Sequence, residues 1–278
     1  MKHPVILDAC TIIHLLCIDE DEFLFKSIKS LDLHIANIVY QEVCRNVNKK
    51  SLPDEQKKYI EQTTPSLLSF SRQTENIIKD ISEDYFKNLC DFTEHKKKHN
   101  GELLSTALSL CVSREKNSKV YFYTDDFPAR NQFSNYFEYQ QIGVIGDSVD
   151  LLLFLHWTNS DFDEKHLKKH LQDLKSECNT SLKEFVNKIQ KKKEKFTIKE
   201  KKDKNLIQNI DKILNGYYLE FDALSINKSI TFFNSSKKYT AIKEIIKQFP
   251  DIDKECWLSK KIINTMELLS SHSIFKIA

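Results

Sequence analysis

The chain has 278 residues and a formal net charge of +2, with 40% hydrophobic and 29% charged residues. This composition is typical of a globular protein of one large or two smaller domains, and it excludes a disordered chain. No apolar run approaches the roughly 18 residues of a membrane span, and the first residues do not resemble a signal peptide. With only four glycines, the glycine-rich loops of P-loop and Rossmann nucleotide-binding sites are excluded.

Two halves of the chain differ in charge. Residues 1–157 carry 18 Lys and Arg against 23 Asp and Glu, whereas residues 158–278 carry 24 against 17. This asymmetry predicts an acidic domain over residues 1–157 and a basic module over residues 158–278. The seven cysteines are scattered and never spaced as CxxC, which predicts a reduced, cytoplasmic protein with no disulfide framework and no zinc finger.

The first domain is expected to be α/β, with a parallel sheet flanked by helices. Residues 3–8 form an apolar run that ends in Asp8, which is typical of a buried parallel strand. Further strands are predicted at residues 31–36, 119–124 and 139–145. Helices are predicted at residues 11–17, at 37–45 with Asn37 as the N-cap, over 51–98 with breaks at Pro53 and Pro65, from Asn100 onward, at 128–136 and at 147–157.

The second module is expected to be all helical. Apolar residues recur at steps of three and four from Phe162 to Ile189, which predicts one long amphipathic helix. The stretch Lys191–Lys204 contains eight lysines. Further helices are predicted at residues 206–214, 239–249 and 257–269.

Several carboxylates are expected to meet at one edge of the sheet, because the ligand crevice of a parallel sheet lies beyond the carboxyl ends of its strands. They come from four separate segments of the chain: Asp8, Glu42, Glu102 and the pair Asp125 and Asp126. Like charges this close raise each other's pKa, and a divalent cation such as Mg²⁺ or Mn²⁺ relieves the repulsion and activates water.

Each carboxylate also has a purely structural interpretation. Glu102 suits the first turn of a helix because of the helix dipole, Asp126 suits an N-cap, and Glu42 suits a solvated helix face. Asp8 is harder to explain in this way, because a carboxylate that ends an apolar strand is costly to bury.

Five motifs in order resemble those of PIN-domain nucleases, over about residues 3–157. They are Val5-Ile-Leu-Asp8-Ala-Cys-Thr11, Tyr40-Gln-Glu42-Val, Gly101-Glu102-Leu-Leu-Ser-Thr-Ala107-Leu, Thr124-Asp125-Asp126-Phe-Pro-Ala-Arg130 and Ile142-Gly-Val-Ile-Gly146. The resemblance implies a PIN-like fold and a metal-dependent endoribonuclease, most often a toxin that an antitoxin neutralises.

The resemblance also implies roles for individual residues. Asp8, Glu102 and Asp126 would hold Mg²⁺ or Mn²⁺, with Asp125 as a substitute or extra ligand and Glu42 as a ligand or water-orienting base. Thr11 and Thr124 occupy positions where hydroxyl groups often support the site. RNA is the expected substrate, contacted by Arg130. The resemblance does not cover the basic module; there, the lysine-rich stretch itself suggests phosphate contacts by Lys191, Lys192, Lys193 and Lys195.

Other functions remain open from the sequence. A DNA nuclease of the same superfamily would carry the same acids, and a non-catalytic RNA-binding or scaffold protein would have a decayed site. An aspartate-nucleophile phosphatase is disfavoured, because its second Asp is replaced here by Cys10. The long helix could instead serve a homodimer or an inhibitor protein, with its lysines merely solvated.

Overall fold

The structure, a computed structural model, describes residues 3–47, 54–79, 81, 83–93, 100–218, 222–249, 251–271 and 273–274. The chain divides into two compact units, and the division lies between His170 and Leu171. The sequence placed this boundary after Trp157. It falls later because Phe162 is fully buried and its ring stacks on that of Phe23, with 6.0 Å between centroids.

The first unit contains a four-stranded sheet in the order β2-β1-β3-β4, in which every pairing is parallel. The strands are β1 (Pro4–Leu7), β2 (Asp32–His34), β3 (Val120–Tyr123) and β4 (Gly143–Gly146). Val5, Ile6 and Leu7 are completely buried, as expected for a central strand covered on both faces. The predicted α/β class with a parallel sheet is therefore confirmed.

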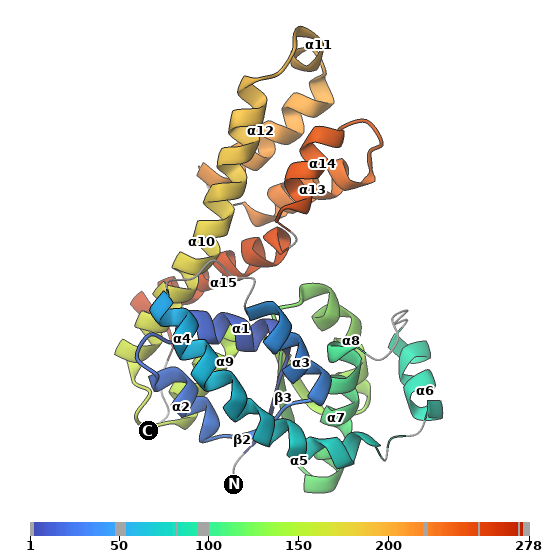
Figure 1. Ribbon diagram of the computed structural model, residues 1–278, viewed down its shortest axis with the longest axis vertical. Helices are drawn as coiled ribbons and strands as arrows, with labels where there is room; N and C mark the ends of the chain where they lie inside the picture. Colours follow the sequence, from blue (N-terminus) through green and yellow to red (C-terminus); the bar gives the residue numbers. More distant parts are fainter. Residues whose placement is uncertain are drawn as a thin grey trace. The chain divides into compact units, whose positions relative to one another are not determined.

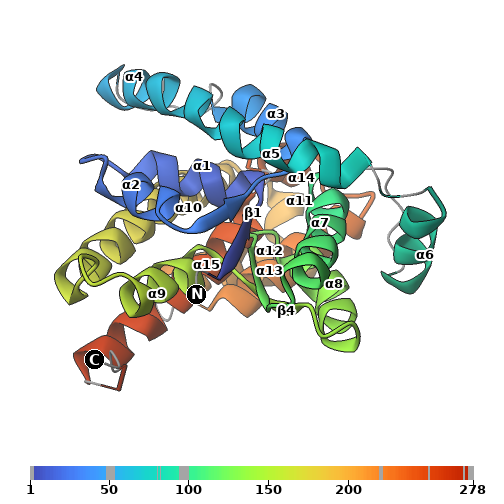
Figure 2. The same cartoon turned by 90° about the horizontal axis from the view of Figure 1, so that it is seen from below.

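Helices cover both faces of this sheet (Figures 1 and 2). They are α1 (Ala9–Ile18), α2 (Phe23–Lys29), α3 (Asn37–Asn46), α4 (Asp54–Thr63), the 3-10 turn η2 (Thr64–Ser66), α5 (Leu67–Lys79), α6 (Glu83–Thr93), α7 (Gly101–Lys116), α8 (Phe127–Tyr139) and α9 (Ser148–Thr158). In Figure 2, α5 and α9 lie on opposite sides of β1. The predicted break at Pro65 falls in η2, whereas Pro53 lies outside the described residues.

Two predicted boundaries were wrong. The strand expected from Tyr139 begins only at Gly143, because α8 continues through Tyr139. A turn follows in which the amide of Ile142 donates to the carbonyl of Phe137 (3.0 Å). Asn37 is the first residue of α3 and not its N-cap, which is Ala36. The side chain of Asn37 instead accepts a hydrogen bond from Ser71 (3.3 Å).

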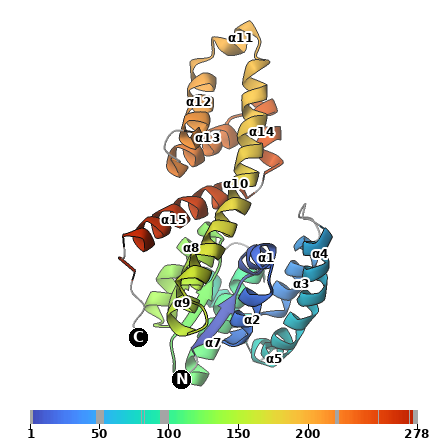
Figure 3. The same ribbon diagram turned by 90° about the vertical axis from the view of Figure 1, so that its left-hand side faces the viewer.

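The secondary-structure elements described in the second unit are all helices (Figure 3). It contains most of α10 (Glu164–Glu194), followed by α11 (Ile198–Lys201), α12 (Lys204–Tyr218), α13 (Ala223–Ser235), α14 (Thr240–Lys247) and α15 (Ile252–Ser270). Its core includes Leu182, Phe185, Ile210, Phe233 and Cys256. The sequence interpretation missed α13. Among the described helices, none is both long and apolar enough to cross a membrane.

Candidate active site

Asp8 lies where β1 ends and α1 begins. Its amide donates to the carbonyl of Tyr123 (3.0 Å), which extends the pairing of β1 with β3 by one residue. Its side chain is buried, and Oδ2 accepts hydrogen bonds from Thr124 Oγ1 (2.9 Å) and Cys10 Sγ (3.1 Å). Burial raises the pKa of Asp8, and the charge of Asp126 raises it further, although these two hydrogen bonds act in the opposite direction.

Glu42, on α3, approaches Asp8 at the start of α7. A Cβ atom on Gly101 would lie 2.9 Å from Glu42 Oε2 and 3.3 Å from Asp8 Oδ1. Both carboxylates therefore occupy space that any larger residue at position 101 would need. Burial raises the pKa of Glu42 to about 7, and the charges of Asp8 and Glu102 contribute to the shift.

Glu102 lies in the first turn of α7, and Asn100 fixes this turn. The Asn100 side chain caps the helix by accepting from the amide of Leu103 (3.1 Å), and its Nδ2 donates to Glu102 Oε2. The sequence interpretation placed Asn100 only at the opening of a helix. In the structure it also orients a candidate site carboxylate.

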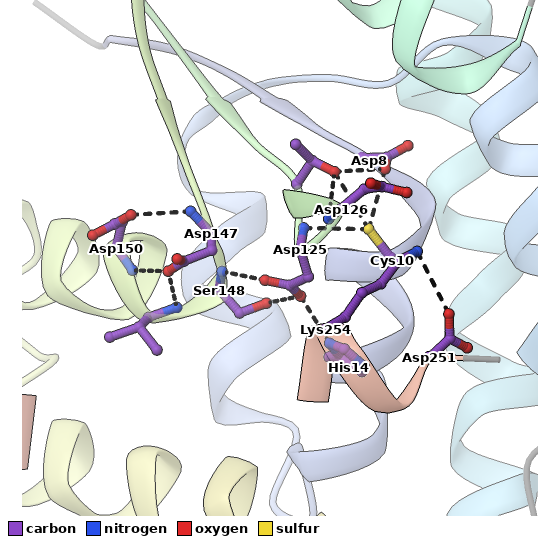
Figure 4. A network of polar contacts seen from close by, with 12 residues as sticks. Asp8, Cys10, His14, Asp125, Asp126, Asp147, Ser148, Asp150, Asp251 and Lys254 are labelled. Atoms are coloured by element: carbon purple, nitrogen blue, oxygen red, sulfur yellow. Dashed lines mark hydrogen bonds and ion pairs between the residues drawn. The ribbon is translucent and has the colours of Figure 1, made fainter. Parts of the chain in front are cut away.

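Asp126 begins α8 next to Asp8. Its Oδ1 accepts from the amide of Ala129 (3.1 Å) as the N-cap, and its own amide donates to Thr124 Oγ1 (3.1 Å). Thr124 therefore links Asp8 and Asp126 through one hydroxyl group. Figure 4 shows Asp8 and Asp126 beside Cys10.

The structure thus places Asp126 near Asp8, and Asp8 and Glu102 near Glu42, at one edge of the sheet. Their oxygen-only donor set suits Mg²⁺ or Mn²⁺ in its chemistry. Within the described residues, however, no three His, Cys, Asp or Glu side chains are grouped closely enough to hold a metal ion as they stand. The donor types fit a hard divalent cation, and coordination would require the side chains to converge further.

Asp125 is not brought to this cluster. Its Oδ1 accepts from the amide of Ser148 (2.8 Å), and its Oδ2 accepts from Ser148 Oγ (2.5 Å) and contacts His14 Nδ1 (2.8 Å). Burial alone would raise the pKa of Asp125, but its contacts with His14 and Ser148 outweigh burial and lower it. Figure 4 shows Asp125 directed toward Ser148 and His14. The expectation that Asp125 could replace Asp126 as a ligand does not agree with this geometry.

Neither His14 nor Cys10 was singled out from the sequence. His14 lies on the apolar helix α1, and its partner Asp125 is 111 residues away. Cys10 contacts both Asp8 and Thr124 Oγ1 (3.4 Å) and accepts from the amide of Asp125 (3.3 Å). The only available signal for Cys10 was its position two residues after Asp8.

The remaining predicted site residues of the first unit have varied surroundings. Thr11 is completely buried, and its hydroxyl group has no hydrogen-bond partner among the described residues. The Arg130 guanidinium donates to Asp147 Oδ2 and lies 5.4 Å from the centroid of the Phe127 ring. Because Asp147 also caps α9, the charge of Arg130 is already paired within the fold.

The four predicted lysines belong to the second unit and differ in their contacts. Lys193 pairs with Asp211 (2.7 Å), and Lys192 lies 6.0 Å from the centroid of the Phe196 ring. Lys191 and Lys195 are exposed and form no ion pair within the described part of the chain. These two are the ones most available to a polyanion.

Comparisons with known proteins identify no relative: no family model matches the chain, and no curated protein or solved structure is significantly similar to it. The geometry of the site is therefore the basis for any functional interpretation.

Proposed function

We propose that the chain is a metal-dependent nuclease of the PIN-like class that hydrolyses phosphodiester bonds in RNA. The observation that carries this proposal is the approach of Asp8 and Glu42, which both flank Gly101 at one edge of a parallel sheet. Asp126 lies near Asp8, Glu102 lies near Glu42, and these like charges raise the pKa of Asp8 and Glu42. Gathering these charges costs stability and contributes no apolar packing. A divalent cation would offset that cost, and the motifs that resemble PIN domains lie at these same positions.

In the proposed site, Asp8, Glu102 and Asp126 would hold Mg²⁺ or Mn²⁺. When bound, the ion supplies Lewis-acid stabilisation of the phosphoryl group and a water molecule of lowered pKa. Glu42 would serve as a further ligand or orient that water.

The surrounding side chains position these acids. The Thr124 hydroxyl group holds Asp8 by donating to Oδ2, and the Asn100 amide holds Glu102. The hydrogen bonds from Ser148 to Asp125 fix the turn between β3 and α8, from which Asp126 extends. Positioning of this kind keeps catalytic groups close to their working geometry.

The experiment is a cleavage assay of the full-length protein on labelled single-stranded RNA and single-stranded DNA, in EDTA, Mg²⁺ or Mn²⁺. We expect RNA cleavage only with metal, and loss of at least about 100-fold in Asp8→Asn, because the amide cannot replace a charged ligand. Asp161→Asn is the matched control, since Asp161 is exposed in the same unit. This control should cleave as the wild type does.

A second measurement does not depend on activity. Mn²⁺ should raise the thermal unfolding temperature of the wild type and of Asp161→Asn, but not that of Asp8→Asn, because bound ligand stabilises only the folded state. Full activity in EDTA, or an equal Mn²⁺ response in all three proteins, would refute the proposed function. Cleavage of DNA but not of RNA would show that the substrate is DNA, and the proposed metal-dependent hydrolysis would stand.

A further inference from the structure

A cavity of about 750 Å³ opens in the second unit. The C-terminal end of α10, the short α11, the first turn of α12 and the start of α14 surround it. Its apolar lining includes Phe196, Leu206, Tyr239 and Ile242, all of them buried side chains. This volume lies within the range of about 300–1,000 Å³ that is usual for small-molecule sites.

Five lysines dominate the polar lining of the cavity, which includes only two carboxylates, Glu200 and Asp203. The lysines are Lys192, Lys199, Lys202, Lys204 and Lys238. In the part of the unit that the structure describes, Lys199, Lys202 and Lys204 form no ion pair. Their positive charge is therefore available to a ligand.

The two carboxylates are already engaged by the protein. Glu200 accepts hydrogen bonds from the amide and the hydroxyl group of Thr197 (both 2.8 Å) at the start of α11. Asp203 accepts from Lys238 Nζ (2.6 Å) and from the amide of Leu206 (3.2 Å). Neither carboxylate is positioned to neutralise Lys199, Lys202 or Lys204.

The N-terminus of α14 adds hydrogen-bond donors to the same cavity. Its N-cap, Tyr239, makes no side-chain capping bond, unlike the side chains of Thr197 at α11 and Asp203 at α12. Thr240 and Ala241 line the cavity, and their amides have no acceptor among the described residues. Unsatisfied amides at the positive end of a helix favour an anion.

We propose that this cavity binds a nucleoside phosphate, with its base against the apolar lining and its phosphate on the lysines and the α14 amides. A simple inorganic anion would use only the charged part of the cavity, and an uncharged apolar molecule would leave the lysines unused. A nucleoside phosphate satisfies both parts, whether it is free or one unit of a strand. The proposal is independent of the acidic cluster in the first unit.

The test is isothermal titration calorimetry of the full-length protein with AMP, adenosine and inorganic phosphate. We expect AMP to bind at least about tenfold more tightly than adenosine or inorganic phosphate, because only AMP contacts both the apolar lining and the charged part of the cavity. Lys202→Gln with Lys204→Gln should weaken AMP binding at least about tenfold through loss of charge-assisted hydrogen bonds. Lys183→Gln with Lys212→Gln removes two exposed lysines outside the cavity and should leave the affinity unchanged.

Thr240→Asp provides a variant that should not fail to fold. An acidic residue in the first turn stabilises a helix, yet here it would place a carboxylate where the phosphate binds. We expect this variant to lose AMP binding while its unfolding temperature is kept or raised. Asp8→Asn should bind AMP as the wild type does, which separates this proposal from the proposed nuclease activity.

Short oligoadenylates with and without a 5′-phosphate identify the source of the ligand. Tighter binding of an oligonucleotide than of AMP, with the same sensitivity to the variants, would support a strand as the source, and the opposite order would support a free nucleotide. The proposal is overturned if AMP does not bind, if adenosine binds as well as AMP, or if the control pair weakens binding as much as the cavity pair.

Discussion

Glu42 is the residue at which the repulsion among the clustered carboxylates is most evident. It is half-buried, and burial together with Asp8 and Glu102 raises its pKa to about 7. Since the pKa in the folded state lies above the ordinary value of 4.5, the protonated form favours folding below pH 4.5. The contribution of protonated Glu42 to the free energy of unfolding is lost as the pH rises through about 7.

Glu42→Gln should therefore stabilise the metal-free protein at alkaline pH. Because Glu42 is partly solvated, we expect a gain of about 1–2 kcal/mol in unfolding free energy at pH 8 and almost none at pH 4.5. Urea unfolding in EDTA across this pH range measures the difference. Glu138→Gln is an exposed control in the same unit and should show no such pH dependence. A gain that does not change with pH would contradict the prediction.

Asp125 and Asp126 are adjacent in sequence but occupy different environments. Asp125 is buried against His14 and Ser148, whereas Asp126 caps α8 and raises the pKa of Asp8. The first aspartate thus stabilises the fold, and the second belongs to the candidate metal site.

The two corresponding asparagine variants should separate these roles. Asp125→Asn disrupts buried contacts to a charged acceptor and should lower the unfolding free energy by about 3 kcal/mol. Asp126→Asn should change it by no more than about 0.5 kcal/mol, since Asn is an equally good N-cap. Chemical unfolding checks both values. The reverse order of effects would show that the roles are exchanged.

Among the secondary-structure elements, α10 contributes its first turns to the first unit. His170 on α10 is completely buried, and its ring stacks on that of Phe162 with 5.6 Å between centroids. Neither ring nitrogen has a hydrogen-bond partner in the described structure. Burial, with a contribution from Lys169, lowers the pKa of His170 to about 4, so the fold retains the neutral ring.

His170→Phe should remove one source of acid sensitivity. The folded pKa lies below the unfolded value of 6.5, so the unfolded chain binds more protons between pH 6.5 and about 4. The unfolding free energy of the wild type should therefore fall by about 2–3 kcal/mol more than that of the variant as the pH falls through that window. The difference between their unfolding free energies from pH 7.5 to 4.5 measures the effect. Parallel pH curves would contradict it.

At the scale of the whole molecule, charge is divided between the two parts of the chain. Residues 1–157 contain an excess of acidic groups and hold the carboxylate cluster, whereas residues 158–278 contain 24 lysines. An acidic cluster without bound metal repels a polyanion, so the proposed nuclease function would need positive charge elsewhere. Lys191 and Lys195 are exposed and form no ion pair in the described structure, and the proposal assigns them this role.

Replacing Lys191, Lys192, Lys193 and Lys195 by Gln in the full-length protein should weaken RNA binding and flatten its dependence on salt. Each lost phosphate contact should reduce the slope of log affinity against log salt by about 0.7 for a single strand. Lys193 is paired with Asp211, so it is less available to a phosphate. The slope should therefore change by the amount expected for two or three lost contacts. Gln preserves helix propensity. The pair Lys183→Gln and Lys212→Gln is the control, and an unchanged slope in the fourfold variant would assign these lysines to another role.

The sequence by itself determined the features that depend on local periodicity. The apolar run before Asp8 predicted a buried parallel strand, and the recurrence from Phe162 to Ile189 predicted the long helix α10. Because parallel strands end at one edge of a sheet, the sequence also predicted that Asp8, Glu42, Glu102, Asp125 and Asp126 would meet. Asp126 acts on the pKa of Asp8, and Asp8 and Glu102 act on that of Glu42, whereas Asp125 contacts His14 and Ser148 instead.

Only the tertiary structure decided which carboxylates share an environment and where the units divide. Asp125 turns away from Asp126 because His14 and Ser148 offer it three hydrogen-bond contacts, and these partners are 111 and 23 residues away in the chain. The cavity near Tyr239 likewise forms between α10, α11, α12 and α14, and the helical periodicity of the sequence does not show that these helices meet. Periodicity reports which face of an element is buried, but long-range contacts determine what each buried polar group faces.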